Sequence, residues 1–102
     1  MAPTRRIVLD VLKPHDPELP EFADQVAGFD GVDAVNVSVI EIDKKVTNVK
    51  LTLEGENLEY DPIQDVIQNL GGTIHSIDEV ACGDYVVYEP TTSSLVRPAW
   101  LR

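Results

Sequence analysis

One amphipathic pattern occurs twice in this 102-residue chain, and it restricts the fold more than any other feature. In each half a strand-like apolar run comes first. A helix-like segment with apolar residues at i, i+3, i+4 and i+7 follows, and a second strand-like run ends the unit. The first unit comprises Arg5–Lys13, a helix carrying Leu19, Phe22, Ala23 and Val26, and Asp33–Asp43; the second comprises Val46–Glu54, a helix carrying Ile63, Val66, Ile67 and Leu70, and Thr73–Ala81.

The order βαββαβ is the plan of the ferredoxin-like, α+β sandwich. It predicts an antiparallel sheet in the strand order 4-1-3-2, with both helices on one face. We expect residues 1–83 to form this single domain and residues 84–102 to form a C-terminal extension, with a short strand at Tyr85–Tyr88 and then a flexible or docked tail. The tail carries four large apolar residues that favour docking on a sister subunit or on another partner: Leu95, Val96, Trp100 and Leu101.

Helix ends are marked by proline and glycine. Pro20 falls in the first turn of the first helix, where a missing N–H costs no hydrogen bond. Gly28 lies where the helix should end. Asp61 and Pro62 are typical of the N-cap and the first residue of the second helix, which Gly71 ends.

The charge is strongly acidic: 18 Asp and Glu against 8 Lys and Arg give a net charge of −10. Such a surface repels phosphate backbones and anionic lipids, so we expect no binding to nucleic acid or to a membrane. Two interpretations remain for the acidic surplus. It favours solubility in concentrated salt, as in halophilic organisms, or it forms a cation-binding surface.

The compartment is predicted from the only cysteine, Cys82, and from the first residues. A single cysteine cannot form an internal disulfide, which is typical of a reducing cytoplasm. The segment Met1–Arg6 is short and runs straight into a strand, unlike a signal peptide, and no apolar stretch approaches the roughly 18 residues of a membrane span. We therefore expect a soluble cytoplasmic protein.

A first candidate metal site combines His15, Asp16 and His75. The first and fourth strands are neighbours in the predicted sheet, roughly 5 Å apart, so the loop that holds His15 can approach His75. Two imidazoles and a carboxylate are ligands for zinc. The alternative is that both histidines are surface or interface residues with ordinary hydrogen bonds.

A second candidate site uses carboxylates for a hard cation such as Ca²⁺ or Mg²⁺. Asp10 interrupts an apolar strand, where an ionised carboxylate needs a partner. Lys50 on the adjacent strand would supply an ion pair. Alternatively Asp10, or Glu41 with Asp43, would bind the cation; we expect the last two on the strand face that buries Val35, Val37 and Val39, because side chains alternate with period two.

Catalytic constellations are absent from the sequence pattern, so we expect no enzyme. Cys82 and His75 lie seven residues apart on one strand, a separation of roughly 23 Å. Gly71 and Gly72 follow a helix, whereas a phosphate-binding loop precedes one. The acidic stretch from Glu54 to Asp61 lacks the order of an EF-hand loop and is predicted to be solvated.

Four segments resemble the archaeal family called "domain of unknown function 211": residues 9–17, 32–43, 51–61 and 71–80. The resemblance covers about residues 5–83. It implies a small archaeal cytoplasmic protein with a ferredoxin-like fold that assembles into ring-like homo-oligomers, and it implies no known reaction.

Two functions remain open at this stage. An open four-stranded sheet leaves the second and fourth strands with unpaired edges, and identical neighbours can close them into a ring with a scaffold or regulatory role. The alternative is a small-ligand or divalent-cation sensor similar to the amino-acid-binding regulatory modules with the same βαββαβ plan. In those modules the ligand lies near the loop after the first strand, which here spans Pro14–Pro20 and carries His15 and Asp16.

Overall fold

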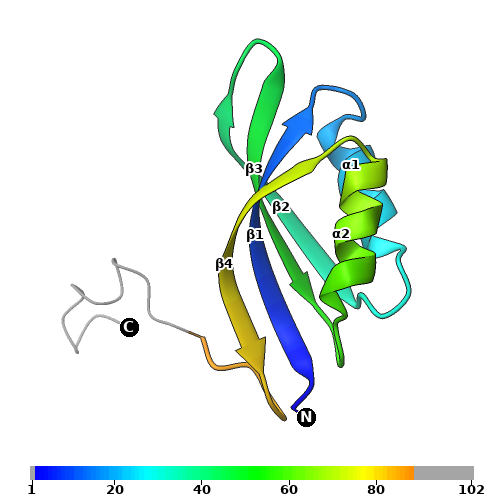
Figure 1. Ribbon diagram of the computed structural model, residues 1–102, viewed down its shortest axis with the longest axis vertical. Helices are drawn as coiled ribbons and strands as arrows, with labels where there is room; N and C mark the ends of the chain where they lie inside the picture. Colours follow the sequence, from blue (N-terminus) through cyan, green and yellow to red (C-terminus); the bar gives the residue numbers. More distant parts are fainter. Residues whose placement is uncertain (1, 89–102) are drawn as a thin grey trace, which may run out of the picture.

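A computed structural model describes residues 2–88. Figure 1 shows a single sheet with two helices packed on one of its faces, in the predicted order βαββαβ. The fold prediction is therefore confirmed. The elements are β1 (Thr4–Pro14), α1 (Leu19–Ala27), β2 (Ala34–Ile42), β3 (Val46–Glu54), α2 (Tyr60–Asn69) and β4 (Thr73–Cys82).

The sheet is antiparallel with the order β2-β3-β1-β4, as predicted. Strands β1 and β3 pair without interruption from Arg6↔Glu54 to Pro14↔Val46. This central pair lies between the edge strands β2 and β4, both of which contain register shifts. The β2–β3 hairpin extends past the helices at one end of the molecule (Figure 1).

The core lies between the helices and the sheet face that they cover. Alternate residues of β1, namely Ile7, Leu9 and Val11, point to this face and are at most 2 % exposed. Burying a side chain of this size contributes roughly 1.5–3 kcal/mol, so this layer accounts for much of the stability. The same cluster includes Val49, Leu51 and Leu53 of β3, Phe22 and Val26 of α1, and Ile63 and Ile67 of α2.

A β-bulge in β2 changes which face its last residues occupy. The register shifts between Val39 and Glu41, so that Glu41 lies opposite Asn48 and Ile42 lies opposite Thr47. One extra residue reverses the alternation of side chains. Our expectation that Glu41 shares the face of Val35, Val37 and Val39 is therefore wrong: Glu41 lies on the helix-free face, and Ile42 lies on the helix side. Val39 was also expected to be buried, but on this edge strand it is 44 % exposed.

The described part of the C-terminal extension contains no strand between residues 83 and 88, so the predicted strand at Tyr85–Tyr88 is not formed. The apolar tail residues from Leu95 onward lie outside the described residues. In residues 2–88, neither helix is long and apolar enough to cross a membrane.

Candidate functional site

A pocket of about 280 Å³ opens at the end of the sheet where the β2–β3 hairpin projects. We call it the Lys13 pocket. It lies between the end of β1, the start of α1, and the facing ends of β2 and β3. Its lining residues are Lys13, His15, Glu18, Leu19, Val39, Ile42 and Thr47.

Lys13 is the only charged residue among residues 2–88 that is buried, with 2 % of its surface exposed. Its Nζ donates a hydrogen bond to the carbonyl oxygen of Pro14 at 2.7 Å and lies 5.8 Å from the centre of the Phe22 ring. Burial lowers the pKa of Lys13 below its ordinary value, while the negative charges of Asp16 and Glu18 oppose that shift.

Lys13 was not among the site residues predicted from the sequence, because a lysine at the end of an apolar strand is usually solvated. The signal was its position: Lys13 continues the alternate series of Ile7, Leu9 and Val11 that faces the helices. Its place in this series explains why the side chain is buried while the ammonium stays near the Phe22 ring.

The rim of the pocket is held by a hydrogen bond between two loops. His15 Nε2 lies 2.9 Å from the backbone carbonyl oxygen of Asp43, which can only accept, so Nε2 carries the hydrogen. The bond joins the loop after β1 to the turn of the β2–β3 hairpin. The carboxylate of Asp43 accepts a separate hydrogen bond of 2.6 Å from the backbone N–H of Lys44.

Of the predicted metal ligands, Glu41 and Asp43 line one small pocket together, and the others are dispersed. Asp16 and His75 are exposed, His75 on the edge strand β4, whereas Asp10 and Glu41 lie on strands that β3 separates. Within residues 2–88 no three His, Cys, Asp or Glu side chains are gathered so that they could hold a metal ion.

Asp10 lies directly opposite Lys50, yet the expected ion pair between them is not formed; the ion pairs of residues 2–88 both involve Arg6. Lys50 is exposed, and a strongly hydrated ammonium on a flexible stem gains little by leaving water. Asp10 Oδ1 and Asn48 Oδ1 are instead buried on the helix-free face without a hydrogen-bond partner in the described part of the chain.

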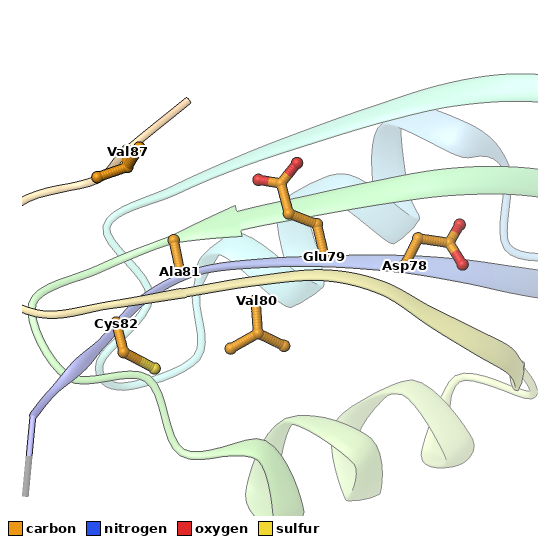
Figure 2. Close-up of a pocket in the computed structure, with 6 residues that line it drawn as sticks. All are labelled: Asp78, Glu79, Val80, Ala81, Cys82 and Val87. Atoms are coloured by element: carbon orange, nitrogen blue, oxygen red, sulfur yellow. The ribbon is translucent and has the colours of Figure 1, made fainter. Parts of the chain in front are cut away.

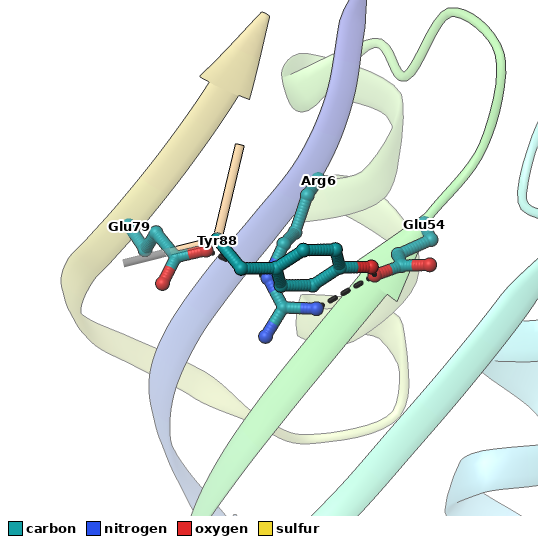
Figure 3. Close-up of polar contacts among 4 residues, drawn as sticks. All are labelled: Arg6, Glu54, Glu79 and Tyr88. Atoms are coloured by element: carbon teal, nitrogen blue, oxygen red, sulfur yellow. Dashed lines mark hydrogen bonds and ion pairs between the residues drawn. The ribbon is translucent and has the colours of Figure 1, made fainter. Parts of the chain in front are cut away.

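Arg6 forms a cluster at the opposite end of the sheet (Figure 3). Its Nη1 contacts Glu54 of β3 and its Nε contacts Glu79 of β4, both at 2.6 Å. The Tyr88 ring lies 5.0 Å from the guanidinium, and the Tyr88 hydroxyl donates to Glu54 at 2.9 Å. Hydrogen bonds from Arg6 and Tyr88 lower the pKa of Glu54. This cluster joins three strands and the start of the C-terminal extension.

A hollow of about 470 Å³ runs along the outer edge of β4, lined by residues 78–82 and by Val87 (Figure 2). Figure 2 shows the alternation of this strand: Val80 and Cys82 point to one side, and Glu79 points to the other. The edge therefore combines an accessible backbone with apolar side chains, of which Val80 is 54 % exposed.

Comparison with known proteins identifies the family of the chain. The model of the DUF211 family, described as uncharacterized ArCR, matches residues 5–94 and so extends beyond residue 83, where the sequence resemblance ended. An uncharacterized protein of Methanocaldococcus jannaschii, MJ0319, is 52 % identical over 88 residues, which are 86 % of this chain and 91 % of the relative. The chain belongs to the DUF211 family.

Proposed function

We propose that this protein is a non-enzymatic scaffold or regulatory protein that forms a ring-like homo-oligomer by joining β2 of each copy to β4 of the next. The observation that carries the proposal is the apolar surface on both edge strands. The exposed fractions are 44 % for Val39, 54 % for Ile40 and 70 % for Ile42 on β2, and 50 % for Ile77 and 54 % for Val80 on β4.

The strand directions suit this contact. β2 is antiparallel to β3, β3 to β1 and β1 to β4, so β2 and β4 of one copy run in opposite directions. A neighbour rotated about an axis along the strands therefore presents its β4 antiparallel to β2. The contact joins two different surfaces, so repeating it builds a ring when the rotation closes. It also satisfies the backbone groups of both edges.

The apolar side chains also lie on matching faces. Val39 and Ile42 are on the helix side of β2, opposite Val49 and Thr47. On β4, Ile77 and Val80 lie opposite Leu9 and Ile7, which belong to the core face. In a sheet continued from one copy to the next, these residues would cover one another. The hollow along β4 gives the neighbouring strand room.

Salt should strengthen the assembly. Each copy carries a net charge of −10, so copies repel one another at low ionic strength. At 1 M salt the Debye length is about 3 Å, which screens this repulsion while leaving the apolar contact intact. The proposed assembly would thus suit the concentrated salt that the acidic composition predicts.

Two variants test the contact, with the molar mass measured by analytical ultracentrifugation in 0.1 M and 2 M KCl. Ile42→Ser changes only the β2 side, and Ile77→Ser changes only the β4 side. Full burial of an isoleucine contributes roughly 1.5–3 kcal/mol, and these residues have half or more of their surface to bury. Each substitution should cost about 1–2 kcal/mol per contact, a weakening of about tenfold.

Mixing the two variants sharpens the test. The Ile42→Ser chain keeps an intact β4, and the Ile77→Ser chain keeps an intact β2, so a 1:1 mixture should form one normal contact and stop at a heterodimer. Tyr85→Ser, at a residue that is 74 % exposed outside both edges, is the matched control and should leave the mass unchanged. A monomeric wild-type protein in both salts would refute the proposal.

A further inference from the structure

Lys13 carries a buried charge whose counter-ion is missing. An ammonium has three N–H donors, and within residues 2–88 one of them has an acceptor, the carbonyl oxygen of Pro14. No carboxylate of residues 2–88 lies within ion-pairing distance of it, since both ion pairs there belong to Arg6. Burying a charge without a partner is costly, so an anionic group beside Nζ would relieve this cost.

The rest of the pocket is suited to a short aliphatic group. Leu19, Val39 and Ile42 form its apolar wall, and Ile42 is 70 % exposed. Its volume of about 280 Å³ lies just below the range of roughly 300–1,000 Å³ typical of drug-sized ligands. A small branched side chain would cover the wall.

The surrounding charges select against a simple anion. The chain has a net charge of −10, and the charges of Asp16 and Glu18 lie close enough to act on Lys13. Glu18 lines the same pocket, and as the N-cap residue of α1 it makes no side-chain capping hydrogen bond. Its carboxylate is therefore available to a positive group of a ligand.

We infer that the Lys13 pocket binds a branched-chain aliphatic amino acid, with the ligand carboxylate at Lys13, the ligand ammonium at Glu18, and the side chain against Leu19, Val39 and Ile42. A zwitterion satisfies both charged residues without adding net charge to the acidic protein. All lining residues come from one chain, so a monomer can bind the ligand. Val39 and Ile42 also belong to the β2 edge of the proposed ring, so a neighbouring copy on that edge would compete with the ligand for this apolar wall.

The test is isothermal titration of the full chain with L-leucine and with two analogues that each lack one charge. 4-Methylpentanoate lacks the ammonium, and 3-methylbutylamine lacks the carboxylate. We expect saturable binding of leucine and at least fivefold weaker binding of either analogue. Lys13→Met should weaken leucine at least tenfold, whereas Lys45→Met, which removes an exposed lysine from the hairpin turn, should not.

Glu18→Gln separates the two charged contacts. It should weaken leucine but leave 4-methylpentanoate unchanged or bound more tightly, because the lost carboxylate contacts only the ammonium. In case Lys13→Met does not fold, the NMR signal of the Lys13 ε-methylene in the wild-type protein gives a second readout. It should shift with leucine and stay unchanged with 3-methylbutylamine.

Three results would overturn the inference: no saturable binding of leucine to the wild-type chain, equal binding to folded Lys13→Met, or equal affinity for leucine and 4-methylpentanoate. The molar mass of the same samples is measured in parallel. Leucine binding to a monomer would contradict the ring and support the pocket, and a ring that ignores leucine would do the reverse.

Discussion

Replacing Arg6 by methionine should destabilise the fold by about 2 kcal/mol at pH 7. The substitution keeps an aliphatic stem but removes the guanidinium that contacts Glu54 and Glu79, each at 2.6 Å. The Arg6 side chain is 18 % exposed and the two carboxylates are 36 % and 32 % exposed. Each ion pair should therefore contribute more to the free energy of unfolding than an exposed pair, which contributes about 0.2–1 kcal/mol. It should contribute well below the roughly 3–5 kcal/mol that is lost when a buried pair is broken.

The loss should depend on pH with a definite sign. The pKa of Glu54 is lowered in the folded protein, so its carboxylate stabilises the fold at any pH above the ordinary glutamate pKa, near 4.3. This contribution is lost as the pH falls from that value through the lower pKa of the folded state. The difference between wild-type protein and Arg6→Met should thus be complete at pH 7 and shrink below about pH 4.5.

Urea unfolding at several pH values, followed by circular dichroism, measures this difference directly. Thermal unfolding at pH 7 is a second measurement, in which the melting temperature should fall by about 10 °C, as expected for about 2 kcal/mol in a domain of this size. Arg5→Met is the matched control. Arg5 donates a hydrogen bond to the carbonyl oxygen of Gly83 and forms no ion pair within residues 2–88. The loss of stability caused by Arg5→Met should therefore not change with pH. A difference below about 0.5 kcal/mol, or one constant from pH 7 to pH 3, would refute the reasoning.

Three further perturbations follow from the packing. Gly55→Ala should destabilise the fold by more than about 1 kcal/mol in urea unfolding, because a Cβ there would lie 2.4 Å from the carbonyl oxygen of Gly31; unchanged stability would show that this loop yields easily. Leu51→Ala removes a fully buried side chain and should cost about 2–5 kcal/mol by the same assay, with a loss below 1 kcal/mol contradicting the assigned core. Burial lowers the pKa of Lys13 in the folded state, so the wild-type protein should gain stability relative to Lys13→Met as the pH rises toward 10.5; a pH-independent difference between them in alkaline unfolding curves would contradict this lowered pKa.

Much of the fold could be predicted because its signals are local and repeated. The two helices follow from apolar spacing, and the β2–β3 hairpin follows from alternation around a polar turn. Two boundary predictions are confirmed: Pro20 lies in the first turn of α1, and Gly71, with φ of 88°, follows the end of α2. The predicted start of the second helix is wrong by two residues, because α2 begins at Tyr60 with Glu59 as its N-cap, and Asp61 lies inside its first turn. Consistent local signals are the condition under which a single sequence specifies one topology.

The candidate site was harder to predict because it depends on the register of the strands and on burial by residues that are far apart in the sequence. A bulge after Val39 moved Glu41 to the helix-free face, and no residue type in the sequence marks that extra residue. The pairing of Asp10 with Lys50 had the right register but not the right contact, since register fixes backbones and leaves a long lysine in water.

By itself, then, the sequence determined the family, the order of the elements and the sheet order, because hydrophobic periodicity and turn residues act over a few neighbouring positions. Only the tertiary structure decided that Lys13 is buried with its ammonium near the Phe22 ring and that Arg6 joins β3, β4 and Tyr88. Burial and ion pairing arise between residues far apart in the chain, and their energies depend on how much water the assembled layers exclude.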